Sequence, residues 1–201
     1  MKKLLCLVGG AMFITFAFAQ NHTNHTFKNR KEPFYIGNYF NMSEPVGKVI
    51  NYKDTSLCLQ DLKDKIVILD FWFTGCTSCI NAFPEEIALQ NEFADKIQII
   101  AVTHEPEKLV RPFLEKWEKK IGEPLNFPIV VDGRSLQKAF RFRYEPHYVW
   151  IMPNGYIDGQ TSSSFVTKGN IKSLIEKWKK LKALLDGEVR VKDVFAITNS
   201  K

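Results

Sequence analysis

The sequence predicts an α/β fold in which helices flank a central mixed sheet. Strand-like apolar runs alternate with segments whose apolar residues recur at helical spacing. Pro153-Asn154-Gly155 then separates two further apolar runs, which is typical of a hairpin. Hydrophobic residues make up 45% of the 201 residues, enough for one core without disulfide staples. These observations together favour one layered domain.

Each element is indicated by local periodicity or turn residues. Short apolar segments within residues 33–62 are broken by Gly37, Pro45 and Gly47, which predicts small strands and turns, that is, an N-terminal β-hairpin extension. Further strands are expected at residues 66–73, 96–103, 127–132, 147–152 and 156–159. Helices are expected after Cys76, from Pro106, over residues 135–140 and in a last segment that ends at Leu185.

Two of these helices carry clear apolar stripes. The helix that Pro106 opens is expected to place four side chains on one face: Leu109, Phe113, Trp117 and Ile121. The last helix is expected to bury six: Ile171, Leu174, Ile175, Trp178, Leu181 and Leu185. Both stripes are interpreted as core.

The N-terminus has the composition of a signal peptide. A basic start, Met1-Lys2-Lys3, precedes an apolar stretch that ends in the cleavage pattern Ala17-Phe18-Ala19. We therefore expect residues 1–19 to be a signal peptide cleaved after Ala19 for export to the periplasm, with an uncleaved anchor as the alternative. Residues 20–32 are predicted to be a disordered lead, residues 33–185 the folded domain and residues 186–201 a C-terminal tail.

Charge and cysteine content exclude several classes of protein. The formal net charge of +6 falls to +4 when Lys2 and Lys3 leave with the signal peptide. The basic residues are spread along the chain without interleaved aromatics, so no nucleic-acid partner is expected. The mature chain keeps Cys58, Cys76 and Cys79, too few for a disulfide scaffold.

Cys76-Thr77-Ser78-Cys79 is the strongest functional signal in the chain. It lies where a buried strand gives way to a helix. The free N–H groups and dipole of a helix start stabilise a thiolate, and lowering a thiol pKa from ~8.5 to ~7 makes about half of it ionised at neutral pH. The pattern favours disulfide exchange.

The residues around this motif resemble those of the TlpA/ResA-like thiol-disulfide oxidoreductases of the thioredoxin-fold superfamily. The resemblance is carried by three segments: Leu59–Trp72, Ala82–Glu85 and Val149–Gly155. It extends from about Phe34 to Leu185 and implies a thioredoxin-like fold and a protein-disulfide reductase with no cofactor.

The resemblance also implies a role for each site residue. Cys76 corresponds to the thiol that attacks the substrate, and Cys79 to the thiol that resolves the mixed disulfide. Asp70 corresponds to a buried acid that accepts the proton of Cys79, or it is a merely hydrogen-bonded residue at a strand end. Pro146 corresponds to a cis-proline that offers backbone to substrate, with an ordinary turn proline as the alternative.

Several positions depart from the family pattern. Gly75 replaces a bulky residue and opens that side of the substrate-binding site, while Thr77-Ser78 replaces pairs that contain proline. His147 takes the place of a threonine and either faces the cysteines or stacks passively on the hairpin. Cys58 is interpreted as a small residue of a secondary core, with an exposed reactive thiol as the alternative. The four residues Cys76-Thr77-Ser78-Cys79 do not decide whether the protein reduces or oxidises its substrates.

Two other functions compete with the reductase. A thiol peroxidase of the AhpC/TSA kind requires Pro-x-x-x-Thr/Ser-x-x-Cys, which Cys76 does not complete. A copper metallochaperone would use Cys76, Cys79 and His147, but related copper proteins separate their cysteines by three residues, and a second Cys-x-x-Cys for zinc is absent from the sequence. We expect no bound metal, disulfide-bearing proteins as substrates, a membrane thiol relay as electron donor, and a monomer.

Overall fold

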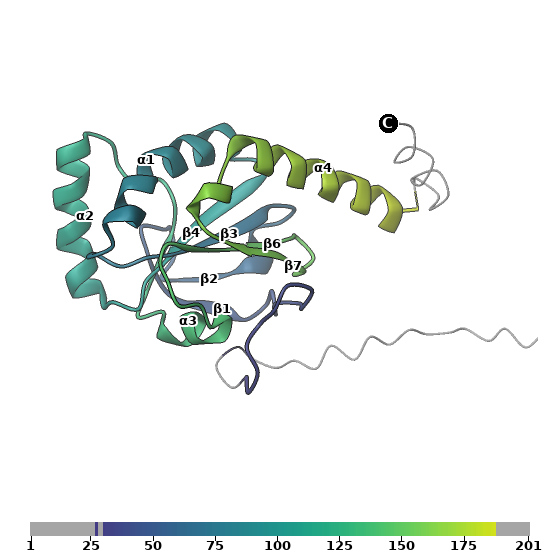
Figure 1. Ribbon diagram of the computed structural model, residues 1–201, viewed down its shortest axis with the longest axis horizontal. Coiled ribbons are helices and arrows are strands. Elements are labelled where there is room, and N and C mark those ends of the chain that lie inside the picture. Colours follow the sequence, from purple (N-terminus) through teal and green to yellow (C-terminus); the bar gives the residue numbers. More distant parts are fainter. Residues whose placement is uncertain (1–26, 28–29, 188–201) are drawn as a thin grey trace, which may run out of the picture.

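The structure is a computed structural model that describes residue 27 and residues 30–187. The predicted signal peptide, most of the predicted lead and residues 188–201 of the predicted tail lie outside the described residues. Within them the chain forms one sheet with helices on both of its faces (Figure 1).

The sheet is mixed and has the strand order β2-β1-β5-β4-β3-β6-β7. β3 is parallel to β4 and β4 to β5, whereas β6 pairs antiparallel with β3 and β1 pairs antiparallel with β5. The strands are β1 (Pro45–Ile50), β2 (Ser56–Cys58), β3 (Ile66–Phe71), β4 (Ile97–Val102), β5 (Ile129–Val131), β6 (His147–Ile151) and β7 (Ile157–Thr161). The predicted fold class is confirmed, and so is the N-terminal hairpin, which is β1–β2.

The helices are divided unequally between the two faces. They are α1 (Thr77–Glu92), α2 (Glu107–Ile121), α3 (Arg134–Phe140) and α4 (Lys168–Leu185). The parallel units β3-α1-β4 and β4-α2-β5 advance in one direction across the sheet, so right-handed crossovers put α1 and α2 on the same face. α4 joins them, and α3 covers the opposite face (Figure 1).

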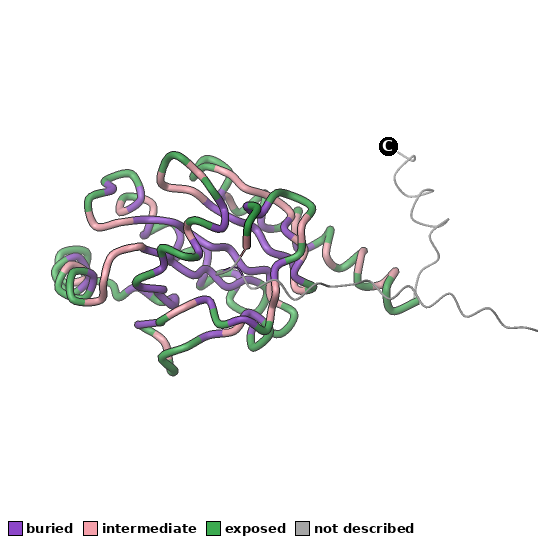
Figure 2. Tube along the Cα trace, turned by 90° about the horizontal axis from the view of Figure 1, so that it is seen from below, coloured by how far each residue is buried: buried purple, intermediate pink, exposed green. Residues whose placement is uncertain are grey.

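β3 shows how the sheet divides two cores. Its side chains alternate, and Ile68 and Trp72, just past its end, pack in the core under α1, α2 and α4. Leu69 and Phe71 pack in the core on the α3 side. The buried strands form the centre of the molecule in Figure 2.

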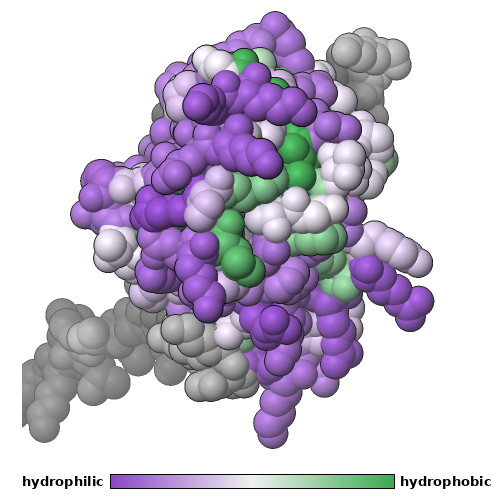
Figure 3. Space-filling model, turned by 90° about the vertical axis from the view of Figure 1, so that its left-hand side faces the viewer, coloured by the Kyte–Doolittle hydropathy of each residue, from purple (hydrophilic) through white to green (hydrophobic). Residues whose placement is uncertain are grey.

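The apolar stripe predicted for α2 is wrong at its two ends, whereas its middle residues, Phe113 and Trp117, pack in the core. Leu109 and Ile121 are 53% and 44% exposed, whereas Val110, Leu114 and Trp117 are buried. A strict spacing of four residues advances about 40° beyond a full turn at each step, so the ends of such a series face different directions. α2 lies at the left of Figure 1, and Figure 3 shows this side of the molecule, with apolar residues gathered between polar ones.

α4 buries only the beginning of its predicted stripe. Ile171 and Ile175 are its buried residues, and Leu185 at its end is 65% exposed. Figure 2 shows the second half of α4 extending beyond the body of the domain. The prediction that all six residues belong to the core is therefore wrong for Leu185, the last residue of this extending helix.

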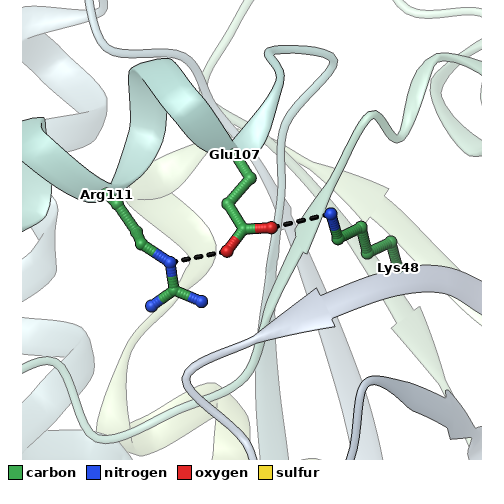
Figure 4. Close-up of polar contacts among 3 residues, drawn as sticks. All are labelled: Lys48, Glu107 and Arg111. Carbon is green, nitrogen blue, oxygen red and sulfur yellow. Dashed lines mark hydrogen bonds and ion pairs between the residues drawn. The ribbon is translucent and has the colours of Figure 1, made fainter.

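Two contacts tie the margins of the domain together. Glu107 in the first turn of α2 accepts from Arg111 Nε at 2.5 Å and from Lys48 Nζ of β1 at 2.7 Å (Figure 4). Phe27, within the predicted lead, is buried and stacks on Phe40 at 5.9 Å. The packed part of the chain thus includes a residue before position 33.

None of the helices in the described part of the chain is long and apolar enough to cross a membrane.

Candidate active site

The candidate site forms where three chain segments meet at one end of the sheet. β3 and β4 are parallel, so their carboxyl ends share an edge, and β6 begins at that edge because it is antiparallel to β3. Phe71 is paired with His147, which puts Pro146 beside the chain that leads to Cys76. The segment after β4 supplies His104 and Glu105.

Cys76 and Cys79 form a disulfide at the start of α1, with their Cα atoms 5.3 Å apart. Cys76 is the N-cap residue, and the backbone N–H of Cys79 donates to its Sγ at 3.2 Å. Ser78 Oγ lies 3.5 Å from the same sulfur. Cys76 is 6% exposed and borders the exposed Gly75 and Thr77, whereas Cys79 is 0% exposed. After reduction the Cys79 amide is therefore placed to stabilise a thiolate on Cys76, the more accessible sulfur.

The loop before the cysteines is held by its own backbone and by Glu105. Cys76 N–H donates to the carbonyl oxygen of Phe73 at 2.9 Å, closing a tight turn in which Gly75 lies. A Cβ at Gly75 would come within 2.9 Å of the Phe73 ring, so a bulky residue here requires that ring to move. Thr74 donates twice to Glu105, from N–H at 2.7 Å and from Oγ1 at 2.9 Å. The segment after β4 thereby positions the cysteine loop.

Asp70 is buried under α1 together with a second acid. It is 0% exposed, and neither of its carboxylate oxygens has a hydrogen-bond partner among the described residues. Glu86 of α1 is 1% exposed and accepts from the hydroxyl of Tyr148 at 2.5 Å. Burial, followed by the charge of Glu86, raises the pKa of Asp70 well above its usual range. Burial likewise raises the pKa of Glu86 to about 7, although the Tyr148 hydrogen bond lowers it.

The Glu145–Pro146 peptide bond is cis, the geometry that the resemblance implies for Pro146. Glu145 is half-buried, accepts from Gln137 Nε2 at 2.9 Å and has a pKa raised by burial. The role of Pro146 in holding substrate backbone stays a prediction.

His147 lies on the other face of the sheet from the cysteines. Its ring stacks on Phe142 with centroids 4.4 Å apart, and Nε2 lies 3.1 Å from Gln160 Oε1 on β7. It is also near Phe71, a residue of the α3-side core. Burial lowers the pKa of His147. This placement favours the second of the two interpretations of His147, passive stacking on the hairpin. Of the three residues predicted to bind substrate, His147 thus lies on the opposite face of the sheet from the cysteines, unlike Gly75 and Pro146, which lie near them.

Cys58 is a free cysteine at the end of β2 and is half-buried between the buried Leu57 and Leu59. Burial raises the pKa of its thiol, which disfavours the thiolate. Its environment is closer to a secondary core than to that of an exposed reactive thiol.

Sequence reasoning missed three residues of the site: Glu86, Tyr148 and Glu105. Glu86 follows Cys79 by two helical turns, so a charged residue stood on the apolar stripe of a predicted helix. Tyr148 alternates with Val149 on a predicted strand, which made it look like ordinary core. No local signal marks Glu105, because its contact with Thr74 joins positions 31 residues apart.

Metal ligands are not gathered here. Within the described residues, no group of three or more His, Cys, Asp or Glu side chains is arranged to hold a metal ion. The three ligands of the copper alternative are likewise not assembled, because His147 lies on the face opposite to Cys76 and Cys79.

Comparison with known proteins identifies relatives of this site. The sequence profile of the AhpC/TSA family matches residues 41–183. Thioredoxin-like protein YneN of Bacillus subtilis is 35% identical over 92 residues, which cover 44% of this chain and 51% of YneN. Thiol-disulfide oxidoreductase ResA of Halalkalibacterium halodurans is 34% identical over 105 residues, 51% of this chain and 56% of ResA. The chain thus spans about half the length of the curated relatives that it matches.

A solved structure agrees in fold. The thioredoxin domain of a thiol-disulfide oxidoreductase from Bacteroides vulgatus superposes with a TM-score of 0.54 at 21% identity, covering 72% of this chain and 98% of that domain. The predicted thioredoxin-like fold and the resemblance to ResA-like proteins are both confirmed.

Proposed function

The chain belongs to the AhpC/TSA family, and from this premise we propose that it is a thiol-disulfide oxidoreductase that reduces disulfides of other proteins. One observation carries the proposal: Cys76 and Cys79 are paired at a helix start, where Cys76 is slightly exposed (6%) and borders exposed residues while Cys79 is completely buried. Curated relatives named thiol-disulfide oxidoreductase support it.

The different exposure of the two cysteines supports different steps for the two sulfurs. In the reduced protein, the Cys76 thiolate attacks a substrate disulfide, forming a mixed disulfide and expelling one substrate thiolate. The Cys79 N–H that donates to Cys76 Sγ stabilises the attacking thiolate. Cys79 then loses its proton and attacks Cys76 Sγ, which closes the intramolecular disulfide and releases the second substrate thiolate. Gly75 and Pro146 flank the place where an extended substrate would lie.

A peroxidase is the competing function that the family name raises. Its peroxidatic loop, Pro-x-x-x-Thr/Ser-x-x-Cys, would need Thr or Ser at position 73 and Pro at position 69, and this chain has Phe73 and Leu69. The disulfide reductase is therefore the function that the residues around Cys76 favour.

The cellular setting is also part of the proposal. The signal-like residues 1–19 support export to the periplasm, where disulfide-bearing envelope proteins, apocytochrome c among them, are the substrates. A reductase in an oxidising compartment needs an external donor, and a membrane thiol relay would supply it to a monomeric protein. A mass measurement on the exported protein tests this: cleavage after Ala19 supports export, and an intact Met1 in the cytoplasmic fraction contradicts it.

Trapping of the mixed disulfide tests the chemistry. Cys79→Ser removes the resolving thiol, so Cys76 should accumulate as a covalent adduct with a disulfide-bearing protein such as insulin. Cys76→Ser should form no adduct and should lose insulin reduction with dithiothreitol. Cys58→Ser is the matched control and should behave as the wild type, because Cys58 lies on an edge strand away from the site.

Two results would overturn the proposal. One is insulin reduction by Cys76→Ser at the wild-type rate. The other is consumption of hydrogen peroxide by the wild type at a rate that exceeds its reduction of protein disulfides, which would favour the peroxidase.

A further inference from the structure

Glu86 is a buried acid that the exchange mechanism, as described so far, does not use. It lies on α1 seven residues after Cys79, and two helical turns place both side chains on the sheet-facing side of the helix. A glutamate is almost never fully buried without a partner, yet Glu86 is 1% exposed and its Oε2 has no hydrogen-bond partner within the described residues.

The alternation of two strands brings Asp70 to the same layer. Asp70 stands between Ile68 and Trp72, which both pack under α1, so its side chain projects to that face of β3. Tyr148 is its direct cross-strand partner on β6 and packs in the same core as Cys79. The hydroxyl of Tyr148 donates to Glu86 Oε1 at 2.5 Å. Two carboxyls and one phenol therefore share the buried layer that also holds Cys79.

The charged groups that act on this space are all acidic. Glu85 of α1 acts on Glu86, and Glu145, the residue before Pro146, acts on Asp70. Two buried carboxylates in one site disfavour a double negative charge, so the pair holds a proton where a lone surface acid would not. The Tyr148 hydroxyl donates to Glu86 and to neither oxygen of Asp70, so the negative charge of the pair is better stabilised on Glu86 and the shared proton lies on Asp70. Glu86, with a pKa of about 7, is the member that titrates near neutrality.

We propose that Glu86 is the final acceptor of the Cys79 proton, that Asp70 passes the proton to it, and that the Tyr148 hydroxyl holds the Glu86 carboxylate in place. The inference rests on the proposed function. Because Glu86 acts through Asp70, it is a positioning residue for the resolving step and not a group that touches the reacting sulfurs.

The proposed step balances in protons and electrons. In the mixed disulfide, protonated Asp70 gives its proton to ionised Glu86 and takes the proton of the Cys79 thiol. The resulting Cys79 thiolate forms a bond to Cys76 Sγ, and the bond from Cys76 to the substrate sulfur breaks. The electron pair of that bond leaves with the substrate thiolate, which takes a proton from water. Glu86 ends protonated and returns its proton to solvent.

A two-phase assay on full-length protein isolates this step. The reduced protein, in a Cys58→Ser background, is mixed with dithiobis-nitrobenzoate. The first coloured thiolate is released when Cys76 attacks, and the second when Cys79 resolves the mixed disulfide. We expect the second phase of the wild type to accelerate with rising pH, with an inflection near the Glu86 pKa of about 7. Asp70→Asn should slow this phase about 100-fold.

The decisive variant is Glu86→Gln, with Glu85→Gln as its matched control on the exposed side of the same helix. Glu86→Gln should lose the inflection near neutrality or move it by at least about one pH unit, since the lost like charge lowers the pKa of Asp70. Glu85→Gln should keep the inflection and move it only slightly to lower pH, since the charge of Glu85 raises the pKa of Glu86 from a more distant, exposed position. The first phase should remain at the wild-type rate in both variants.

Further variants protect the test against a folding defect. Tyr148→Phe removes a hydrogen bond that lowers the pKa of Glu86, so the inflection should move to higher pH. Glu86→Asp keeps an ionisable group and should restore a titrating second phase. An unchanged inflection in Glu86→Gln, or in Tyr148→Phe where Glu86→Gln does not fold, overturns the inference and leaves the proposed function intact. Absence of the first phase in the wild type overturns both.

Discussion

The two faces of the sheet bury very different groups. On the α3 side, Phe34, Phe40, Phe71 and Phe140 form a cluster whose neighbouring ring centroids lie 5.2 to 6.3 Å apart. On the α1 side, an equally buried layer holds a disulfide, two acids and a phenol. Consecutive residues of one strand, Asp70 and Phe71, point into these two environments.

The two faces therefore differ in how their buried groups affect the free energy of unfolding. Buried aromatic rings contribute free energy through apolar area and packing. Buried acids without cationic partners cost free energy, because the ionised form is disfavoured in a low-dielectric interior. A fold keeps such groups where their shifted pKa values serve a reaction. We therefore infer that the α3-side core stabilises the domain, whereas the α1-side layer holds the groups proposed to carry out the reaction.

The largest expected effect comes from breaking the apolar face. Phe71→Ala removes a ring that packs on Phe140 at 5.8 Å and on Phe142 at 4.8 Å. The free energy of unfolding should fall by about 3–5 kcal/mol, the usual cost of such a cavity. Chemical denaturation measures it, and Phe165→Ala, at an exposed ring, is the control. A loss below about 1 kcal/mol would contradict the structural role given to this face.

The next effect belongs to the acidic layer and depends on pH. Folding raises the pKa of Glu86 from 4.5 to about 7, so between these values the folded state binds more protons than the unfolded state. Stability should therefore fall as the pH rises through this window, by about 3 kcal/mol at 1.36 kcal/mol per pH unit. Glu86→Gln should lack this contribution. Denaturation of both proteins at about pH 4 and about pH 8 measures it, and parallel pH dependences would count against the burial of Glu86.

The smallest of the three effects concerns the contact that holds the cysteine loop. Glu105→Gln weakens two hydrogen bonds to Thr74 at a half-buried position, which should cost about 1 kcal/mol. The rate at which Cys76 attacks a disulfide should fall with it, since the loop before the helix start becomes less ordered. Glu115→Gln, at an exposed position of α2, is the control and should change neither measurement. Equal behaviour of the two variants would show that Glu105 does not position the loop.

Local patterns predicted the elements that carry the site. The apolar run that predicts β3 and the helical spacing that predicts α1 each lie within about ten residues, and both elements are present in the structure. The predicted face of α2 failed over a longer range, because a repeat of four drifts from the true helical period. Leu109 and Ile121 look equivalent in the sequence and differ from Trp117 only once the helix packs.

Long-range contacts account for what the sequence left open. The two interpretations of His147 place its ring either toward the cysteines or away from them. The stacking of the ring on Phe142 favours the position away from the cysteines. Glu86 stands on the apolar stripe of a predicted helix, but its burial beside Asp70 follows only from the packing of α1 on the sheet. Its partner Tyr148 is 62 residues away along the chain.

The sequence by itself determined the type of chemistry and the order of elements, because a Cys-x-x-Cys at a strand-to-helix junction and the periodicity of apolar residues are local properties. Only the tertiary structure decided which sulfur is accessible, which acids lie behind it and which face holds His147. Burial and pKa depend on the atoms that surround a group, and for Asp70 and Glu86 those atoms come from three separate elements of the fold.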